Sequence, residues 1–322
     1  MMHDSKKIQK HLKNPKELWK TNNSILGNEP KKNEDLEFIC DDGLLITDHS
    51  EISNCFNNFF TNIGKQLSDK IVQPPNAKLQ LPPFVSPTIY LHPTTQEEVH
   101  KIIQELKPKC GGVDGIHAKT ILRLEEFILE PLVHIFNICI GMAVWPDALK
   151  SAEIKPIFKD GDKHKLNNYR PISLISNIAK IFEKIIYNRL YSFMKKNKII
   201  SENQFGFMKN IGTTDALGLI TKLILEKIDK KIPVAVAFLD LAKAFDTVNH
   251  AILLEKLKRY GIRGHASNLL ASYLQGRKQR VKLNGQTSET VENSGNWSSS
   301  RHYSWSFIIH FIHKRLTHVA SW

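Results

Sequence analysis

The segment at residues 234–240 constrains the fold of this chain most strongly, because it is short, continuously apolar and ends in an acid. It reads Val-Ala-Val-Ala-Phe-Leu-Asp and follows Pro233. A run of this length and β-branched content predicts a strand buried on both faces, as in the middle of a sheet. Such a strand delivers Asp240 at its carboxyl end, where a side chain can reach a cleft.

Asp240 is the best single candidate in the chain for binding a metal ion. Hard cations such as Mg²⁺ prefer carboxylate oxygens, and a two-metal site needs two or three carboxylates around ions about 4 Å apart. The alternative role for Asp240 is an N-cap for a helix that begins near Val248, but Asp246 or Thr247 suits that role better. The segment therefore favours phosphoryl-transfer chemistry.

The charge balance points to a polyanionic partner. The chain has 45 Lys and Arg against 32 Asp and Glu, a net charge of +13, which suits nucleic acid. Lysines that only solvate helix faces would give the same excess. No apolar run approaches the ~20 residues of a membrane span, so we expect a soluble intracellular protein without a membrane partner. The choice of nucleus or cytoplasm and the oligomeric state stay open.

The cysteines indicate neither a zinc module nor a disulfide framework. They are widely spaced and form no C-x-x-C pair. The four are Cys40, Cys55, Cys110 and Cys139. A reducing setting fits this pattern best.

Periodicity and turn signals predict an N-terminal region with one helix. Residues 1–34 form a polar, lysine-rich arm, and a proline-rich linker follows at 74–93. Between them, Asp48 and Glu51 give a helix-start signal. One apolar face then follows at helical spacing. It comprises Ile52, Cys55, Phe56, Phe59, Phe60, Ile63 and Leu67.

The remaining elements follow from the same signals. Thr95 and Glu98 form a capping box that opens a short helix. The later elements are a loop at 107–115, apolar helix at 119–142, a strand at 154–158, a helix at 178–193 and a hairpin turning at Asn284–Gly285.

Three blocks before the apolar strand carry more specific signals. The first reads Gly-Val-Asp-Gly-Ile at 112–116. The second reads Ala-Glu-Ile-Lys-Pro-Ile-Phe-Lys-Asp-Gly-Asp at 152–162 and leads into Tyr-Arg-Pro-Ile-Ser-Leu at 169–174. The third reads Gln-Phe-Gly-Phe at 204–207, before Gly-Thr-Thr-Asp-Ala at 212–216. Lys159 and Arg170 of the second block suit contacts with phosphates on a predicted hairpin; the alternative is a solvated basic loop.

A family resemblance emerges when these blocks are joined to residues 237–250. That segment reads Ala-Phe-Leu-Asp-Leu-Ala-Lys-Ala-Phe-Asp-Thr-Val-Asn-His. In order and spacing the blocks resemble the reverse transcriptases of non-LTR (LINE-type, jockey-like) retrotransposons, from the Phe-rich helix to Glu292. The resemblance implies an RNA-directed DNA polymerase, a nucleotidyltransferase that uses an RNA template, a DNA primer, dNTPs and Mg²⁺.

The resemblance also implies roles for single residues. Asp240 would be catalytic and would bind the magnesium ions, with the carbonyl of Leu241 assisting. Phe245 would lie under the nucleotide sugar, while Lys159 and Arg170 would bind the triphosphate. The residues that would support template and primer are Gln204, Phe205 and Gly206.

The chain departs from the family in its acidic residues. The family carries an aromatic-x-Asp-Asp turn further along, but no aspartate follows Asp246 here; the later acids are Glu255, Glu289 and Glu292. We therefore expect a chain that is inactive as encoded. One alternative is a non-catalytic fragment that binds nucleic acid, and another is an unfolded remnant with an uncovered apolar face.

The composition changes after Gly295 in a way that suggests a shifted reading frame. Three of the five tryptophans lie there, at 297, 305 and 322. Trp has the single codon TGG, so a frame that starts at the second base of this codon begins with GG and gives glycine at Trp297 and Trp305. Residues 297–315 can then read Gly-Val-Pro-Gln-Gly-(Ile or Thr)-Ile-Leu-Gly-Pro-Leu-Leu-Phe-Ile-Leu-Tyr-Ile-Asn-Asp, which resembles the next block of the family. The alternative is a genuine Trp-, Ser- and His-rich tail.

The sequence thus predicts an α+β fold with right-hand polymerase architecture: fingers, an incomplete palm and no thumb. Residues 1–93 form an N-terminal extension and linker, and residues 94–233 a fingers-like region. Residues 234–296 form a partial palm, and residues 297–322 an out-of-frame tail.

Overall fold

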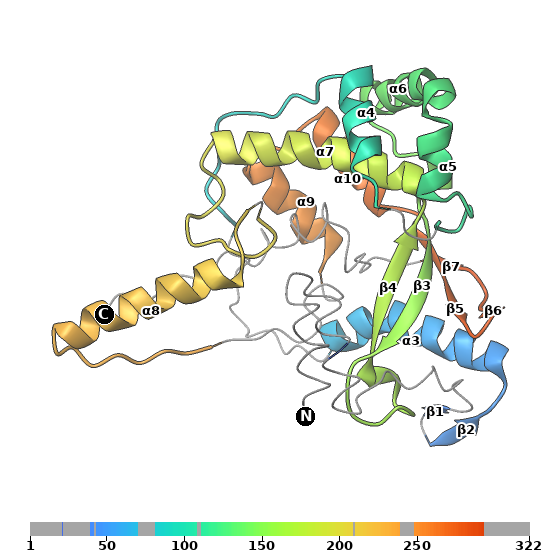
Figure 1. The fold of residues 1–322 in the computed structure, drawn as a ribbon, viewed down its shortest axis with the longest axis horizontal. Coiled ribbons are helices and arrows are strands. Elements are labelled where there is room, and N and C mark those ends of the chain that lie inside the picture. Colours follow the sequence, from blue (N-terminus) through green and yellow to red (C-terminus); the bar gives the residue numbers. More distant parts are fainter. Residues whose placement is uncertain are drawn as a thin grey trace.

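A computed structural model describes residues 21, 39–41, 43–69, 81–107, 111–208, 210–238 and 248–292. Within these ranges the fold is a small mixed sheet with one long helix on one of its faces and a separate helical layer at one end (Figure 1). Apart from residue 21, the predicted arm at 1–34 lies outside the described residues, and so does the predicted out-of-frame tail.

The sheet is built around β3 (Ser151–Phe158). It pairs antiparallel with β4 (Tyr169–Ile175) on one edge and parallel with β5 (Lys278–Leu283) on the other. The short strands β6 (Gln286–Thr287) and β7 (Val291–Glu292) both pair with β5. A separate two-stranded sheet joins β1 (Ile39–Asp41) to β2 (Leu44–Ile46). The described fold is therefore mixed α and β, as predicted.

Helix α3 (His49–Asp69) covers one face of the main sheet with its Phe-rich side. The backbone N–H of Glu51 donates to the side chain of Asp48 at 2.9 Å, which confirms the predicted helix start. Phe56 is fully buried and meets the ring of Tyr169 edge-on at 4.8 Å. The predicted apolar face is therefore core, and it fixes which face of the sheet is closed.

The helical layer contains the larger core. Its elements are α4 (Gln96–Gln104), α5 (Ala118–Arg123), α6 (Glu125–Met142), α7 (Asn177–Lys196), α9 (His250–Arg259) and α10 (His265–Leu274). The rings of Phe182, Trp145 and Tyr273 pack in sequence, with centroids 4.3 and 4.5 Å apart. Since Phe182 lies on α7 and Tyr273 on α10, this ring cluster joins helices that are distant in the sequence.

Several predicted boundaries agree with the structure. The hydroxyl of Thr95 accepts from the N–H of Glu98 at 3.3 Å, so it caps α4. The predicted strand at 154–158 is part of β3, and the predicted helix at 178–193 is part of α7. Asn284 and Gly285 have φ values of 49° and 81° between β5 and β6, as a type I′ hairpin requires. The apolar region at 119–142 is two helices, because the chain breaks at Leu124.

Two predictions about residues 234–249 are wrong. Residues 234–238 form no strand, and their side chains are exposed, that of Phe238 by 85%. A strand buried on both faces needs partners on its edges, and no described strand pairs with this segment. The N-cap of α9 is Asn249, whose side chain accepts from the N–H of Ile252 at 3.1 Å, rather than Asp246 or Thr247.

The preceding helix α8 (Thr213–Asp229) is uncovered in the same way. It has no buried residue and extends away from the helical layer (Figure 1). Apolar side chains on it are exposed by 50% or more. These are Leu217, Leu223, Leu225 and Ile228. Helix α8 and residues 232–238 therefore form a continuous stretch of exposed apolar chain.

The predicted proline-rich linker is partly packed. Residues 81–94 have no helix or strand, but Ile89 and Leu91 are buried in the helical core. The backbone of this segment bonds to the turn between α9 and α10, through Val85 N–H to Arg259 and Ile89 N–H to Gly261. Residues 81–94 thus form a strap across the helical layer. The predicted domain boundary at residue 93 separates this strap from the helices that it packs against.

Because the strap lies against Gly261, a side chain at this position should destabilise the fold. This glycine has a φ of 91°, and a Cβ there would lie 2.2 Å from the carbonyl oxygen of Pro87. We expect Gly261→Ala to lower the free energy of unfolding by at least about 2 kcal/mol, because positive φ and a backbone clash both oppose it. Urea denaturation measures the change.

Gly264→Ala is the matched control. Gly264 also has positive φ, at 56° with ψ −130°, but nothing lies within 4 Å of its Cβ position, so only the backbone cost of about 1–3 kcal/mol applies. Equal losses in the two variants would show that the strap does not press on Gly261.

Candidate functional site

The hairpin of β3 and β4 positions the two predicted phosphate-binding residues. Lys159 follows β3 directly, and its N–H donates to the carbonyl of Asn168 at 2.9 Å. Arg170 lies opposite Ile157 in the ladder, and its side chain is exposed. The Lys159 ammonium group is half exposed and 3.5 Å from Asp160, a surface pair that holds it weakly. Both cations are therefore close together on one hairpin and accessible to a ligand.

Local hydrogen bonds fix the hairpin tip. The Asp162 carboxylate accepts from the N–H of His164 at 2.9 Å, and the Asp162 carbonyl accepts from the Asn168 amide at 2.9 Å. The first of these bonds lowers the pKa of the Asp162 carboxyl below its usual value, because it favours the charged form. The Tyr169 hydroxyl donates to the Lys163 carbonyl at 2.8 Å, which anchors the tip to the start of β4.

The predicted loop at 112–116 packs against the end of the same hairpin. The amide of Asn177, at the start of α7, donates to the carbonyl of Ile116 at 2.7 Å. A Cβ on Gly112 would lie 2.4 Å from the backbone of Ile175, so only glycine fits there. The structure therefore joins the first two sequence blocks at the junction of β4 and α7.

The third block lies elsewhere. Gln204, Phe205 and Gly206 form a turn after α7, in which the Gln204 amide donates to the Gly206 carbonyl at 2.8 Å. Helix α7 begins two residues after β4 and has 20 residues, about 30 Å of helix. Gln204 and Phe205 are half-buried and Gly206 is exposed. This turn and the hairpin thus lie toward opposite ends of α7.

Asp240, Leu241 and Phe245 lie outside the described residues, so their predicted roles stay predictions. In the described part of the chain no group of three or more His, Cys, Asp or Glu side chains could hold a metal ion. The described residues also include no helix that is long and apolar enough to cross a membrane.

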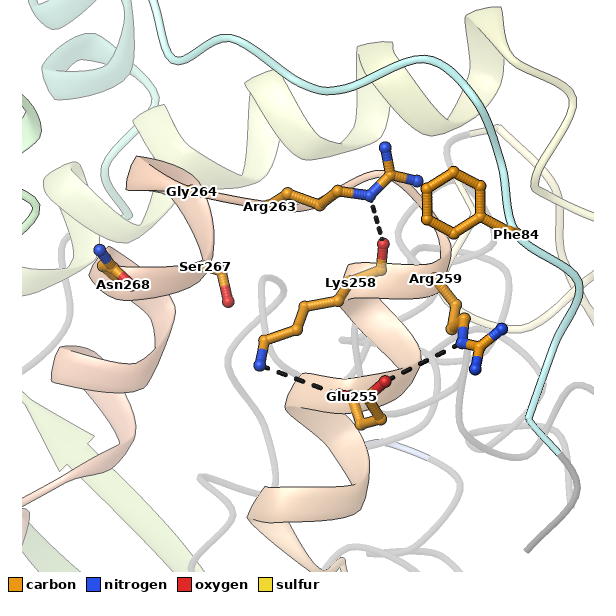
Figure 2. A pocket seen from close by; sticks show the side chains of 8 residues that line it. All are labelled: Phe84, Glu255, Lys258, Arg259, Arg263, Gly264, Ser267 and Asn268. Carbon is orange, nitrogen blue, oxygen red and sulfur yellow. Dashed lines mark hydrogen bonds and ion pairs between the residues drawn. The ribbon is translucent and has the colours of Figure 1, made fainter.

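Sequence reasoning missed a basic hollow of about 400 Å³ between α9, α10 and the strap (Figure 2). Arg263 lies over the ring of Phe84 at 3.8 Å and donates to Lys258, Ser86 and Thr88. Glu255 pairs with Lys258 and Arg259 at 3.8 and 3.9 Å. The cations that line the hollow are thus engaged with other groups of the chain, and Arg263 holds the strap in place. No sequence signal pointed to this hollow, because the strap and α9 are distant in the sequence.

The sequence matches known proteins across these elements. Residues 159–306 match the family described as reverse transcriptase (RNA-dependent DNA polymerase). The match begins at Lys159 and ends ten residues into the predicted out-of-frame tail. The chain therefore carries a reverse transcriptase domain.

Individual relatives narrow the class. The chain is 30% identical over 278 residues to "Probable RNA-directed DNA polymerase from transposon BS" of Drosophila melanogaster, and the aligned region covers 83% of this chain and 29% of the relative. It is 35% identical over 195 residues to the "RNA-directed DNA polymerase from mobile element jockey" of Drosophila funebris, and that aligned region covers 60% of this chain and 21% of the relative. The domain is of the non-LTR retrotransposon type. The chain spans less than a third of the length of these relatives.

The hairpin tip gives a prediction about pH. We expect Asp162→Ala to speed amide hydrogen exchange at His164 at neutral pH, because the carboxylate no longer accepts that N–H. The folded pKa is lowered, so the stabilising bond is complete above the unfolded value of about 3.8 and is lost as pH falls through the folded value. An NMR titration of the carboxyl checks the direction.

Asp160→Ala is the control for this change, since within the described residues Asp160 makes a single ion pair, with Lys159 at 3.5 Å. Exchange at His164 should be nearly unchanged in this variant. Equal acceleration in both variants would contradict the role given to Asp162.

Proposed function

We propose that this domain serves RNA-templated DNA synthesis and that the β3–β4 hairpin binds the incoming dNTP. The observation that carries the proposal is the family match together with the placement of Lys159 and Arg170, both accessible on one ordered hairpin. Two accessible cations on one hairpin suit a triphosphate, because charge-assisted bonds to phosphate oxygens are strong.

The reaction is attack of the primer 3′-hydroxyl on the α-phosphate of the dNTP, with pyrophosphate as the leaving group. Asp240 and the carbonyl of Leu241 would hold Mg²⁺, which when bound stabilises the attacking and leaving oxygens. Phe245 would lie under the nucleotide sugar. Gln204, Phe205 and Gly206 would support template and primer from the turn after α7.

The architecture proposed for this reaction is a right hand. Residues 94–233 would form the fingers and residues 234–296 part of the palm. The distance along α7 between the hairpin and the turn at 204–206 supports this division, since it leaves room for a nucleic acid between a nucleotide contact and a template contact.

We further propose that the chain is inactive as encoded because its reading frame shifts near codon 296. The sequence supplies no aspartate after Asp246, and the shifted reading of residues 297–315 restores a block of the family. The exposed apolar side chains of α8 and of residues 232–238 support this view, because burial of such a surface is worth roughly 25 cal/mol per Å². The palm block that the restored frame would encode is our candidate for the cover of this surface.

A second candidate function is nucleic-acid binding without catalysis. The net charge of +13 favours it, and binding needs no metal site. Steeply salt-dependent binding without nucleotide incorporation would distinguish it from the polymerase.

The frame proposal predicts the nucleotide sequence. Genomic DNA and transcript across codons 285–322 should show codons that fit the shared-base reading, and the restored frame should lead into an aromatic-x-Asp-Asp turn. Codons at 297–315 that cannot be read in this way would refute the shift. The Trp-, Ser- and His-rich tail would then be genuine.

The dNTP proposal predicts kinetic changes in a frame-restored enzyme. We expect the 322-residue chain to incorporate no nucleotide and the restored chain to do so. In the restored chain Arg170→Gln should raise the KM for dNTP by about tenfold, the value of one charge-assisted bond. Primer extension on an RNA template measures both.

Lys165→Gln is the matched control, because Lys165 lies on the same hairpin connection but outside the β3–β4 ladder. Its KM should stay near that of the parent enzyme. An unchanged KM in Arg170→Gln would remove the hairpin from nucleotide binding.

A further inference from the structure

Helix α10 begins without a side-chain cap at the hollow between α9, α10 and the strap. Its N-cap is Gly264, and no side-chain cap bond is formed there. The N–H of Asn268 donates to the Gly264 carbonyl at 3.0 Å, so the three N–H groups before it have no partner within the helix. Such groups carry partial positive charge. Since Gly264, Ser267 and Asn268 all line the hollow, this helix end faces it (Figure 2).

The side chain of Ser267 is buried at the same helix end, and no hydrogen bond joins it to the part of the chain that the structure describes. Only 7% of Ser267 is exposed. Ser272 of the same helix, by contrast, accepts from the N–H of Trp145 at 2.9 Å. Figure 2 shows the Ser267 hydroxyl pointing into the space between α10 and α9. A buried hydroxyl without a partner costs free energy, so its position indicates a ligand in the hollow.

Positive charge is in excess around this helix end. Three cations line the hollow against one carboxylate, that of Glu255. Glu255 is shared between Lys258 and Arg259, at 3.8 and 3.9 Å. The side chain of Lys258 is 54% exposed, and an ion pair of this length and exposure is weak. Its ammonium group therefore keeps donors for a ligand.

Arg263 fixes the opposite wall of the hollow. Its guanidinium group donates to the carbonyl of Lys258 and to the hydroxyl of Thr88, each at 2.9 Å, and lies over the ring of Phe84. The strap is thus held against α9 before a ligand binds, which lowers the ordering cost of binding. Phe84 itself is 63% exposed, so it offers an apolar surface beside the charged groups.

The donors around the hollow suit a phosphate group. Backbone N–H groups at a helix start bind phosphate readily, and the hydroxyl and the ammonium group add bonds to its oxygens, of which the second is charge-assisted. A dianion would balance the excess of two positive charges. The hollow of about 400 Å³ is large enough for a small ligand, so an organic group attached to the phosphate has room beside Phe84.

We propose that the hollow between α9, α10 and the strap binds a phosphate dianion, either free or as the terminal phosphate of a small monoester. Its oxygens accept from the first N–H groups of α10, the Ser267 hydroxyl and the Lys258 ammonium group. Arg263 is a positioning residue. No residue of the β3–β4 hairpin lines the hollow, so this site goes beyond the proposed function and does not depend on it.

Isothermal titration calorimetry of the full chain with inorganic phosphate, at fixed ionic strength, tests the site. Ser267→Ala should weaken phosphate binding by about tenfold, the value of one hydrogen bond to a charged group. Lys258→Gln should weaken it several-fold. Melting temperature shows that each variant is folded. Absence of binding by the parent chain, or equal affinity in Ser267→Ala, would overturn the proposal.

Helix α9 offers a matched control in Lys256. This residue lies on the same helix, two positions before Lys258, but does not line the hollow. Lys256→Gln removes the same charge, so phosphate affinity should change little. Equal losses in Lys256→Gln and Lys258→Gln would overturn the proposal in favour of diffuse charge.

A carboxylate at the start of α10 should imitate the ligand. An acid in the first turn of a helix and beside cations is favourable. We therefore expect Ser267→Asp to raise the melting temperature in the absence of phosphate and to abolish phosphate binding. A variant that is less stable than the parent and still binds phosphate would contradict the site.

Competition separates the two sources of phosphate. Tighter binding of UMP than of inorganic phosphate, with the same loss in Ser267→Ala, assigns the site to a small monoester; equal or weaker binding of UMP assigns it to free phosphate. An RNA oligonucleotide with hydroxyl groups at both ends carries only phosphodiesters and should not displace inorganic phosphate. Displacement by this RNA, weakened alike by Ser267→Ala, would overturn the proposal in favour of a nucleic-acid contact.

Discussion

Strand β3 is hydrogen-bonded along both edges, and the rest of the described fold depends on that register. One edge pairs with β4 through a local hairpin, and the other pairs in parallel with β5, which comes much later in the chain. A slip of one residue would exchange the faces of β3. It would bury Lys155 under α3 and expose Ile154. The β3–β4 hairpin, the α3 core and the face that carries Lys155 thus all depend on one register.

The helical layer is held together by contacts between residues that are distant in sequence. Trp145 is 2% exposed between rings from α7 and α10. The Tyr273 hydroxyl donates to the buried Glu183 carboxylate at 2.5 Å. A buried acid of this kind is retained only where a hydrogen bond compensates for its lost hydration. The strap at 81–94 adds a third connection, since its backbone closes over the turn at Gly261.

The β3–β4 hairpin and the sheet face that carries Lys155 contain few acidic residues where they are described. Lys155 and Arg170 are exposed and Arg280 is half-buried, while Asp160 and Glu153 near them are paired with cations. Such an arrangement attracts phosphates over about 10 Å at moderate salt. Metal-dependent phosphoryl transfer needs carboxylates as well. The best candidate in the sequence is Asp240, which follows an exposed stretch that no described strand pairs with.

The sequence by itself determined the local elements and the family. Helical periodicity predicted α3 and α7, Asn284 and Gly285 predicted the hairpin turn, and Thr95 predicted the start of α4. Each of these depends on residues a few positions apart. The order and spacing of the motifs likewise pointed to a non-LTR reverse transcriptase domain, because those motifs are contiguous blocks that can be recognised without knowing how they pack.

Only the tertiary structure decided what pairs across long distances. It joined β5 to β3, laid the strap over α9, and so put Arg280 and Lys282 on the face that carries Lys155. It also left residues 234–238 without a strand partner, although their composition favours a buried strand. The physical reason is the same in each case: a strand's composition expresses a tendency to be buried, but its burial and its register require a partner that local sequence does not specify.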